Sequence, residues 1–87
     1  MKYQVYFETA RSTESREAAQ IGTMLADMEK AVRALELEIA SEENRVRIHD
    51  PSNFAYPVAA KSFMARRDNL RQSMEILANR LSALTGA

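Results

Sequence analysis

Two long stretches of this chain repeat apolar residues at intervals that alternate between three and four positions. The first runs from about residue 11 to residue 48, and the second runs from about residue 57 to residue 85. Neither stretch is interrupted by proline, and Gly22 is the one glycine within them. Heptad spacing of this kind places apolar residues along one side of an α-helix, where another helix can cover them. The chain is therefore predicted to form two long helices.

The apolar stripe is nearly continuous in both stretches. One charged residue interrupts each stripe, Glu42 in the first and Arg67 in the second. The first stripe consists of Ala18, Ile21, Leu25, Met28, Val32, Leu35, Ile39, Glu42 and Val46, and the second of Ala60, Phe63, Arg67, Leu70, Met74, Leu77, Leu81 and Leu84.

Residues 50–56 separate the two stretches and form the predicted turn, with Phe54 in it. Asp50-Pro51 ends the first helix, because a residue that precedes proline avoids helical geometry. Tyr56-Pro57 marks the start of the second helix at Pro57, since proline is tolerated at the first helical position. Two heptad helices joined by so short a turn are expected to pack antiparallel. The predicted fold is all-α, an antiparallel two-helix coiled-coil hairpin over residues 10–87, with pairing of two hairpins into a four-helix bundle as a further option.

The spacing of the two stripes also predicts which residues face each other across the seam. Leu35 is expected opposite Leu70, and the layers on either side follow the same rule. Glu42 and Arg67 then fall in adjacent layers. They either form an ion pair that fixes the register or extend their charged ends to the edge of the seam.

Composition and charge limit the classes of function. The chain has 87 residues, enough for one small domain, and it has no cysteine for a thiolate metal site or a cysteine nucleophile. Its single histidine, His49, lies in the turn beside Asp50, and we interpret it as an ordinary turn residue. The 12 Lys and Arg balance the 12 Asp and Glu, which leaves no basic excess for nucleic acid. We expect no enzymatic activity, cofactor, metal site or nucleic-acid partner.

The sequence also suggests a location. No apolar run approaches the roughly 18 residues of a membrane span, and the first residues lack the features of a secretory signal. Lack of cysteine is typical of cytoplasmic proteins. We therefore expect a cytoplasmic protein with no membrane span.

Charge is unevenly divided between the two predicted helices. Residues 11–47 carry 6 basic and 8 acidic side chains, whereas residues 57–87 carry 5 basic and 2 acidic ones. An acidic helix next to a basic helix favours pairing of the two, or association between copies of the chain.

A single seam between two helices rarely stabilises a chain of this size by more than a few kcal/mol. A protein partner or a second copy is therefore expected. Residues 1–9 are predicted to form an aromatic N-terminal arm, which either caps the open end of the hairpin near Leu84 or forms a short strand or an extended segment. The candidates for contact with a partner lie in this arm, on the flanks of the seam or away from it: Tyr3, Tyr6, Phe7, Leu37, Met64, Arg66, Arg71 and Ile76.

The region around the turn carries a recognisable combination of residues. Glu42-Glu43 precedes the segment Asp50-Pro51-Ser52-Asn53-Phe54-Ala55-Tyr56-Pro57, and Arg66-Arg67-Asp68-Asn69-Leu70 follows it. This combination resembles the alphaproteobacterial branch of the flagellar export protein FliJ family, over roughly residues 17–72. The resemblance implies a cytoplasmic coiled-coil adaptor or escort at the flagellar type III export apparatus, with the export ATPase, the export gate or chaperones as partners. The alternative is a self-assembling structural or regulatory hairpin unrelated to export.

Overall fold

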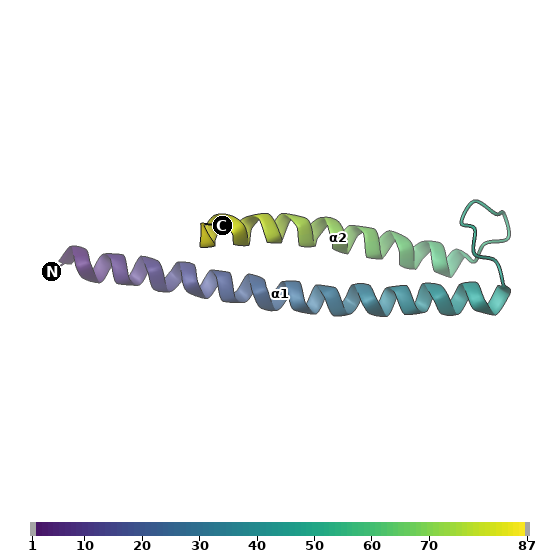
Figure 1. Cartoon of the computed structure of the whole chain (residues 1–87), viewed down its shortest axis with the longest axis horizontal. Coiled ribbons are helices and arrows are strands. Elements are labelled where there is room, and N and C mark those ends of the chain that lie inside the picture. Colours follow the sequence, from purple (N-terminus) through teal and green to yellow (C-terminus); the bar gives the residue numbers. More distant parts are fainter. Residues whose placement is uncertain (1, 87) are drawn as a thin grey trace.

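The computed structural model describes the backbone of residues 2–86 and the side chains of residues 13–86. Its elements are helix α1 (Lys2–Val46) and helix α2 (Val58–Thr85), joined by a loop at residues 47–57. The two helices lie side by side and run in opposite directions, and α1 extends well past the C-terminal end of α2 (Figure 1). The structure confirms the predicted all-α antiparallel hairpin.

The helix boundaries differ from the predicted ones at three places. Helix α1 begins at Lys2 instead of near residue 11, so residues 2–9 continue the helix rather than forming a separate arm. Nothing in these residues breaks a helix, because they contain neither glycine nor proline. Helix α1 ends at Val46 rather than near residue 48, where Arg47 adopts a left-handed φ of 59°. Pro57 is the N-cap of α2, with an extended backbone, so that helix begins at Val58.

The C-terminal end of α2 has a glycine cap. Gly86 takes a left-handed φ of 72°, and its backbone N–H donates to the carbonyl oxygen of Ser82. Glycine is the common residue at this position because it adopts a left-handed conformation without steric cost. Helix α2 therefore ends at Thr85, where the second apolar stretch was expected to end.

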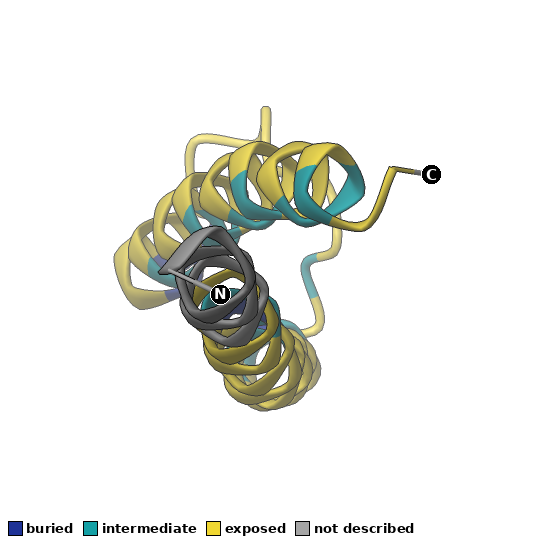
Figure 2. Ribbon diagram, turned by 90° about the vertical axis from the view of Figure 1, so that its left-hand side faces the viewer, coloured by how far each residue is buried: buried dark blue, intermediate teal, exposed yellow. Residues whose placement is uncertain are grey.

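The side of each helix that faces its neighbour is the predicted apolar stripe. Every stripe residue of both helices is buried or half-buried. Ile21, Val32 and Ile39 of α1 are no more than 8% exposed, and Ala60 of α2 is fully buried. In the end-on view of Figure 2, the half-buried residues gather where the helices approach each other, and the outer sides are exposed. The heptad pattern therefore identified the contact surface correctly.

The molecule is a thin rod with one seam for a core. It measures 69 × 17 × 17 Å and exposes 6784 Å² to solvent. A compact monomer of 9.8 kDa would expose about 5,200 Å². The hairpin thus leaves about a third more surface in water than a compact chain of its mass.

Candidate protein-interaction surface

Two ion pairs between the helices define their register. Arg71 Nη2 lies 2.6 Å from Glu36 Oε1, and Arg80 Nη2 lies 2.9 Å from Glu17 Oε1. We assign the stripe residues to heptad positions a and d, starting with a at Ala18 in α1 and at Ala60 in α2. The first ion pair then joins two e positions, and the second joins two g positions. Antiparallel helices bring e beside e and g beside g when each a residue faces a d residue of the other helix. The layers therefore place Leu35 opposite Arg67.

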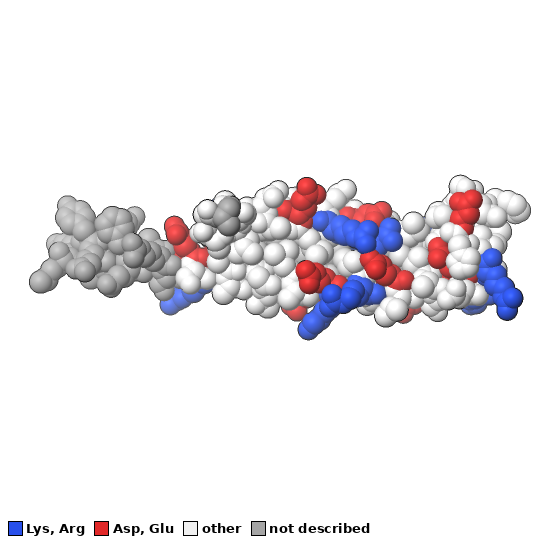
Figure 3. All heavy atoms as spheres, viewed as in Figure 1, with Lys and Arg blue, Asp and Glu red and all other residues white. Residues whose placement is uncertain are grey.

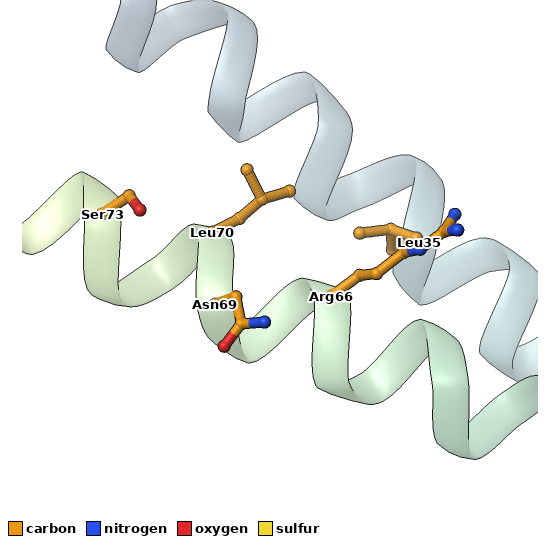
Figure 4. A pocket seen from close by; sticks show the side chains of 5 residues that line it. All are labelled: Leu35, Arg66, Asn69, Leu70 and Ser73. Carbon is orange, nitrogen blue, oxygen red and sulfur yellow. The ribbon is translucent and has the colours of Figure 1, made fainter.

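This register differs from the predicted one by about half a heptad. Leu35 was expected opposite Leu70, but Leu70 instead falls in the layer of Val32. Figure 4 shows the Arg66 side chain reaching α1 beside Leu35, while Leu70 meets α1 at another level along the helix. Both registers match one apolar stripe to the other, so the stripes alone could not distinguish them. The charged residues that flank the stripes could have done so.

The two charges within the stripe have neighbours on their own helices. Glu42 Oε2 accepts a hydrogen bond of 2.8 Å from Arg45 Nη2. Arg67 Nε lies 3.1 Å from Asp68 Oδ1. The predicted ion pair between Glu42 and Arg67 is therefore replaced by two local pairs. Their side chains are 24% and 20% exposed, so the charged ends lie at the edge of the seam, which is the other arrangement considered above.

A cluster around Tyr56 closes the hairpin at the loop end. The Tyr56 side chain is buried, and its hydroxyl donates a hydrogen bond of 2.6 Å to Glu43 Oε2. The same hydroxyl lies 3.5 Å from Met64 Sδ, and His49 Nδ1 lies 3.5 Å from Glu43 Oε1. The bond to the Glu43 carboxylate, together with burial, raises the pKa of Tyr56 to about 12. Tyr56 thus acts as a structural anchor, and Met64, a predicted interaction residue, packs inside the hairpin.

The loop is shaped by short side-chain to backbone bonds. Asp50 Oδ1 accepts hydrogen bonds from the backbone N–H of Ser52 at 3.0 Å and from its hydroxyl at 2.8 Å. These bonds hold the pKa of the exposed Asp50 below its ordinary value of 3.8. Asn53 Oδ1 accepts from the N–H of Ala55 at 2.8 Å, and the N–H of Tyr56 donates to the Asn53 carbonyl at 3.0 Å.

These hydrogen bonds confirm that a turn forms in the predicted place. Phe54 lies in this turn, and its side chain is fully exposed. Pro51 lies in the same loop, and its side chain is exposed. The contribution of Ser52 and Asn53 was missed. Asx-type turns, in which Asp or Asn bonds the backbone two residues on, were the signal for it.

The remaining predicted interaction residues fall into three groups. Leu37 and Ile76 are 72% and 69% exposed on the outer sides of their helices. Arg66 is exposed beside the seam, whereas Arg71 is bound to Glu36. The side chains of Tyr3, Tyr6 and Phe7 lie outside the described part of the structure.

One flank of the seam is open, and sequence reasoning did not single it out. A shallow groove of about 420 Å³ lies there, lined by Leu35, Arg66, Asn69, Leu70 and Ser73 (Figure 4). A second hollow, of about 440 Å³, is lined by α1 alone, through Ala19, Gln20, Thr23 and Met24, and only Met24 of these belongs to this flank. We call this flank the g face, after the heptad position of the residues on it: Glu17, Met24, Ala31, Glu38, Arg45, Ala59, Arg66, Ser73 and Arg80. The Glu17–Arg80 ion pair covers the g face near the C-terminal end of α2, so the face is open only between that pair and the loop.

The g face is open because of the size of its side chains. Ala31, Ala59 and Ser73 at its g positions are small and cover little of the seam beside them, where Leu35 and Leu70 are half-buried. The opposite flank, at the e positions, is covered by the Glu36–Arg71 ion pair and by the bond between Tyr56 and Glu43. Ala31, Ala59 and Ser73 at g positions near the middle of the hairpin were the signal in the sequence.

Acidic and basic side chains lie next to one another over the middle of the hairpin, on the face seen in Figure 3. Among the described residues, no cluster of three His, Asp or Glu side chains could hold a metal ion. Neither described helix contains an apolar stretch long enough to cross a bilayer. Comparisons with protein-family models, curated proteins and solved structures give no match for this chain. The candidate functional surface is therefore defined by the open flank and the exposed apolar side chains.

Proposed function

We propose that this chain is a non-enzymatic coiled-coil adaptor that binds partner proteins through the sides of its hairpin. The observation that carries this proposal is the open g face, where Leu35 and Leu70 line a groove instead of being covered. Half-exposed leucines along a helix pair are the surface that a further amphipathic helix covers, with anchors spaced three and four residues apart.

The shape of the molecule supports the same proposal. A rod 69 Å long presents a long side for contact. Leu37, Ile76, Phe54 and Val58 add large apolar side chains that are each more than two-thirds exposed. These residues point to several sides of the rod, as expected for an adaptor that contacts more than one chain.

We further propose the cytoplasmic side of the flagellar type III export apparatus as the setting, with the export ATPase, the export gate or a chaperone as the partner. The support is the resemblance carried by Glu42-Glu43, the Asp50–Pro57 segment and Arg66-Arg67-Asp68-Asn69-Leu70. Asp50, Asn53 and Tyr56 of that segment each form a bond that shapes the loop.

The test is binding of the purified chain to the purified export ATPase of the same organism, measured by isothermal titration calorimetry. We expect saturable binding, and we expect Ser73→Asp, which places a charge in the groove beside Leu70, to weaken it at least about tenfold. Ala34→Asp adds a charge at an exposed position of α1 and serves as the control. Absence of binding up to about 100 μM, a range that includes weak transient complexes, would contradict the proposal if deletion of the gene also left flagellar secretion unchanged.

A second candidate function is a self-assembling structural or regulatory hairpin without an export partner. The open g face favours it equally, because a second hairpin covers such a face as well as a foreign helix does. Normal motility of a deletion strain, together with self-association of the purified chain, would favour this candidate over the first.

A further inference from the structure

The g face has a polar pattern that fits one occupant in particular. Glu38 and Arg66 occupy g positions on the two helices at nearly the same level along the rod, and the Arg66 side chain lines the groove and reaches α1 beside Leu35 (Figure 4). Their levels agree because Leu35 faces Arg67 in the register set by the two ion pairs between the helices. Neither side chain has an ion-pair partner within the described part of the chain. The g face therefore carries Leu35 and Leu70 in the groove and, close by, one charge of each sign without an ion-pair partner.

We propose that the g face binds the g face of a second copy of this chain, which gives a four-helix bundle with twofold symmetry. A second copy on the g face occupies the surface assigned above to a partner helix, so this proposal rests on the second candidate function, self-assembly of the hairpin.

A twofold axis along the rod places α1 of one copy over α2 of the other. Each Glu38 then lies opposite Arg66 of the second copy, and the contact occurs twice. Every neighbouring helix pair in such a bundle is antiparallel, as in up-down four-helix bundles.

The opposite net charges of the two helices favour this arrangement. The segment 11–47 carries 6 basic and 8 acidic residues, and the segment 57–87 carries 5 basic and 2 acidic ones. The proposed axis brings the acidic helix of each copy against the basic helix of the other. The alternative axis, across the rod, would place α1 over α1 and Glu38 near Glu38, which like-charge repulsion disfavours.

The available area also suits a dimer. The paired part of the rod is about 42 Å long, since α2 has 28 residues that each rise about 1.5 Å. A face of that length and 17 Å wide covers about 700 Å² per copy, close to the roughly 800 Å² per partner of a standard stable interface. The excess surface of the hairpin is large enough to supply it.

The test is sedimentation velocity on the wild-type chain and two charge-reversal variants, Arg66→Glu and Glu38→Arg, from about 1 μM to about 200 μM. We expect the wild type to dimerise and each variant to self-associate at least about tenfold more weakly, because each creates two like-charge contacts. An equimolar mixture of the two variants should dimerise again, since the mixed dimer restores an opposite-charge contact at both sites. Contacts within one chain cannot produce recovery on mixing.

Lys61→Glu, which reverses a charge on the outer side of α2, is the matched control and should dimerise like the wild type. Circular dichroism should show that all variants remain helical, and a variant that does not fold is replaced by the neutral change Arg66→Gln or Glu38→Gln. A wild-type monomer throughout the concentration range would overturn the proposal. A dimer that is insensitive to both reversals, or variants that fail to recover on mixing, would overturn it as well.

Discussion

At the residue scale, the contact that most defines the loop end is the hydrogen bond from Tyr56 to Glu43. Its length of 2.6 Å and its carboxylate acceptor make it a charge-assisted bond. It joins the loop to α1 across a buried side chain, so it connects two segments that would otherwise meet only through apolar contacts.

Tyr56→Phe keeps the buried ring and removes this bond. We expect the variant to lose about 2 kcal/mol of unfolding free energy, because the Glu43 carboxylate loses its donor in a half-buried position. Urea titration at pH 8 measures the change, and Glu43→Gln with the double variant completes a mutant cycle. Equal stability of wild type and variant would show that the bond contributes nothing.

The pKa of Tyr56 gives this bond a pH signature. The folded value of about 12 exceeds the ordinary value of 10.0, so the folded state favours the neutral phenol. The stabilisation is complete below pH 10 and is lost as the pH rises through about 12. The difference between wild type and Tyr56→Phe should therefore shrink as denaturation is followed from pH 9 to pH 11.5, and a constant difference would contradict this assignment.

At the scale of the helices, residues two positions apart in sequence differ strongly in exposure, depending on whether they belong to the stripe. Ile39 and Leu37 are both large, apolar and on α1, but Ile39 is 7% exposed and Leu37 is 72% exposed. Ile39→Ala should lower the unfolding free energy by about 2–3 kcal/mol, and Leu37→Ala by less than about 0.5 kcal/mol. Urea titration of the two variants checks this, and similar losses in both would show that the seam lies elsewhere.

The register of the helices can be tested by disulfide formation, because the chain contains no cysteine. Leu35→Cys with Arg67→Cys should oxidise readily to an intramolecular disulfide, since these residues share a layer. Leu35→Cys with Leu70→Cys should oxidise much more slowly, because bridging requires Cα atoms within about 7 Å. Non-reducing electrophoresis at low protein concentration reports the rates, and the reverse order would restore the register expected from the stripes.

The heptad pattern predicted which sides of the two helices are in contact, but it predicted neither the start of α1 nor the register between the helices. The stripes from Ala18 to Val46 and from Ala60 to Leu84 identified both contact sides, because burial requires apolar residues at heptad spacing. The start of α1 was misplaced, since alternation at Tyr3, Val5 and Phe7 imitates a strand although nothing there breaks a helix. The register was misplaced because it depends on flanking pairs such as Glu36 with Arg71.

At the scale of the whole molecule, the open g face could not be predicted from the stripes, because it results from what lies beside them. It depends on the small side chains of Ala31, Ala59 and Ser73 and on the positions of the ion pairs, Glu36–Arg71 on the opposite flank and Glu17–Arg80 near the C-terminal end of α2. An exposed groove lined by leucines leaves a two-helix hairpin of this size marginal by itself. Its stability should therefore depend on whatever covers that face.

Whether a second copy completes the hairpin is tested by the midpoint of thermal unfolding as a function of protein concentration, followed by circular dichroism. A hairpin completed by a second copy unfolds by dissociation, so its midpoint should rise by roughly 10 °C over a hundredfold increase in concentration. Arg66→Glu should have a lower midpoint than the wild type at each concentration, because two like-charge contacts weaken its dimer. A wild-type midpoint that is independent of concentration would contradict the account, since the single seam would then suffice to fold the chain.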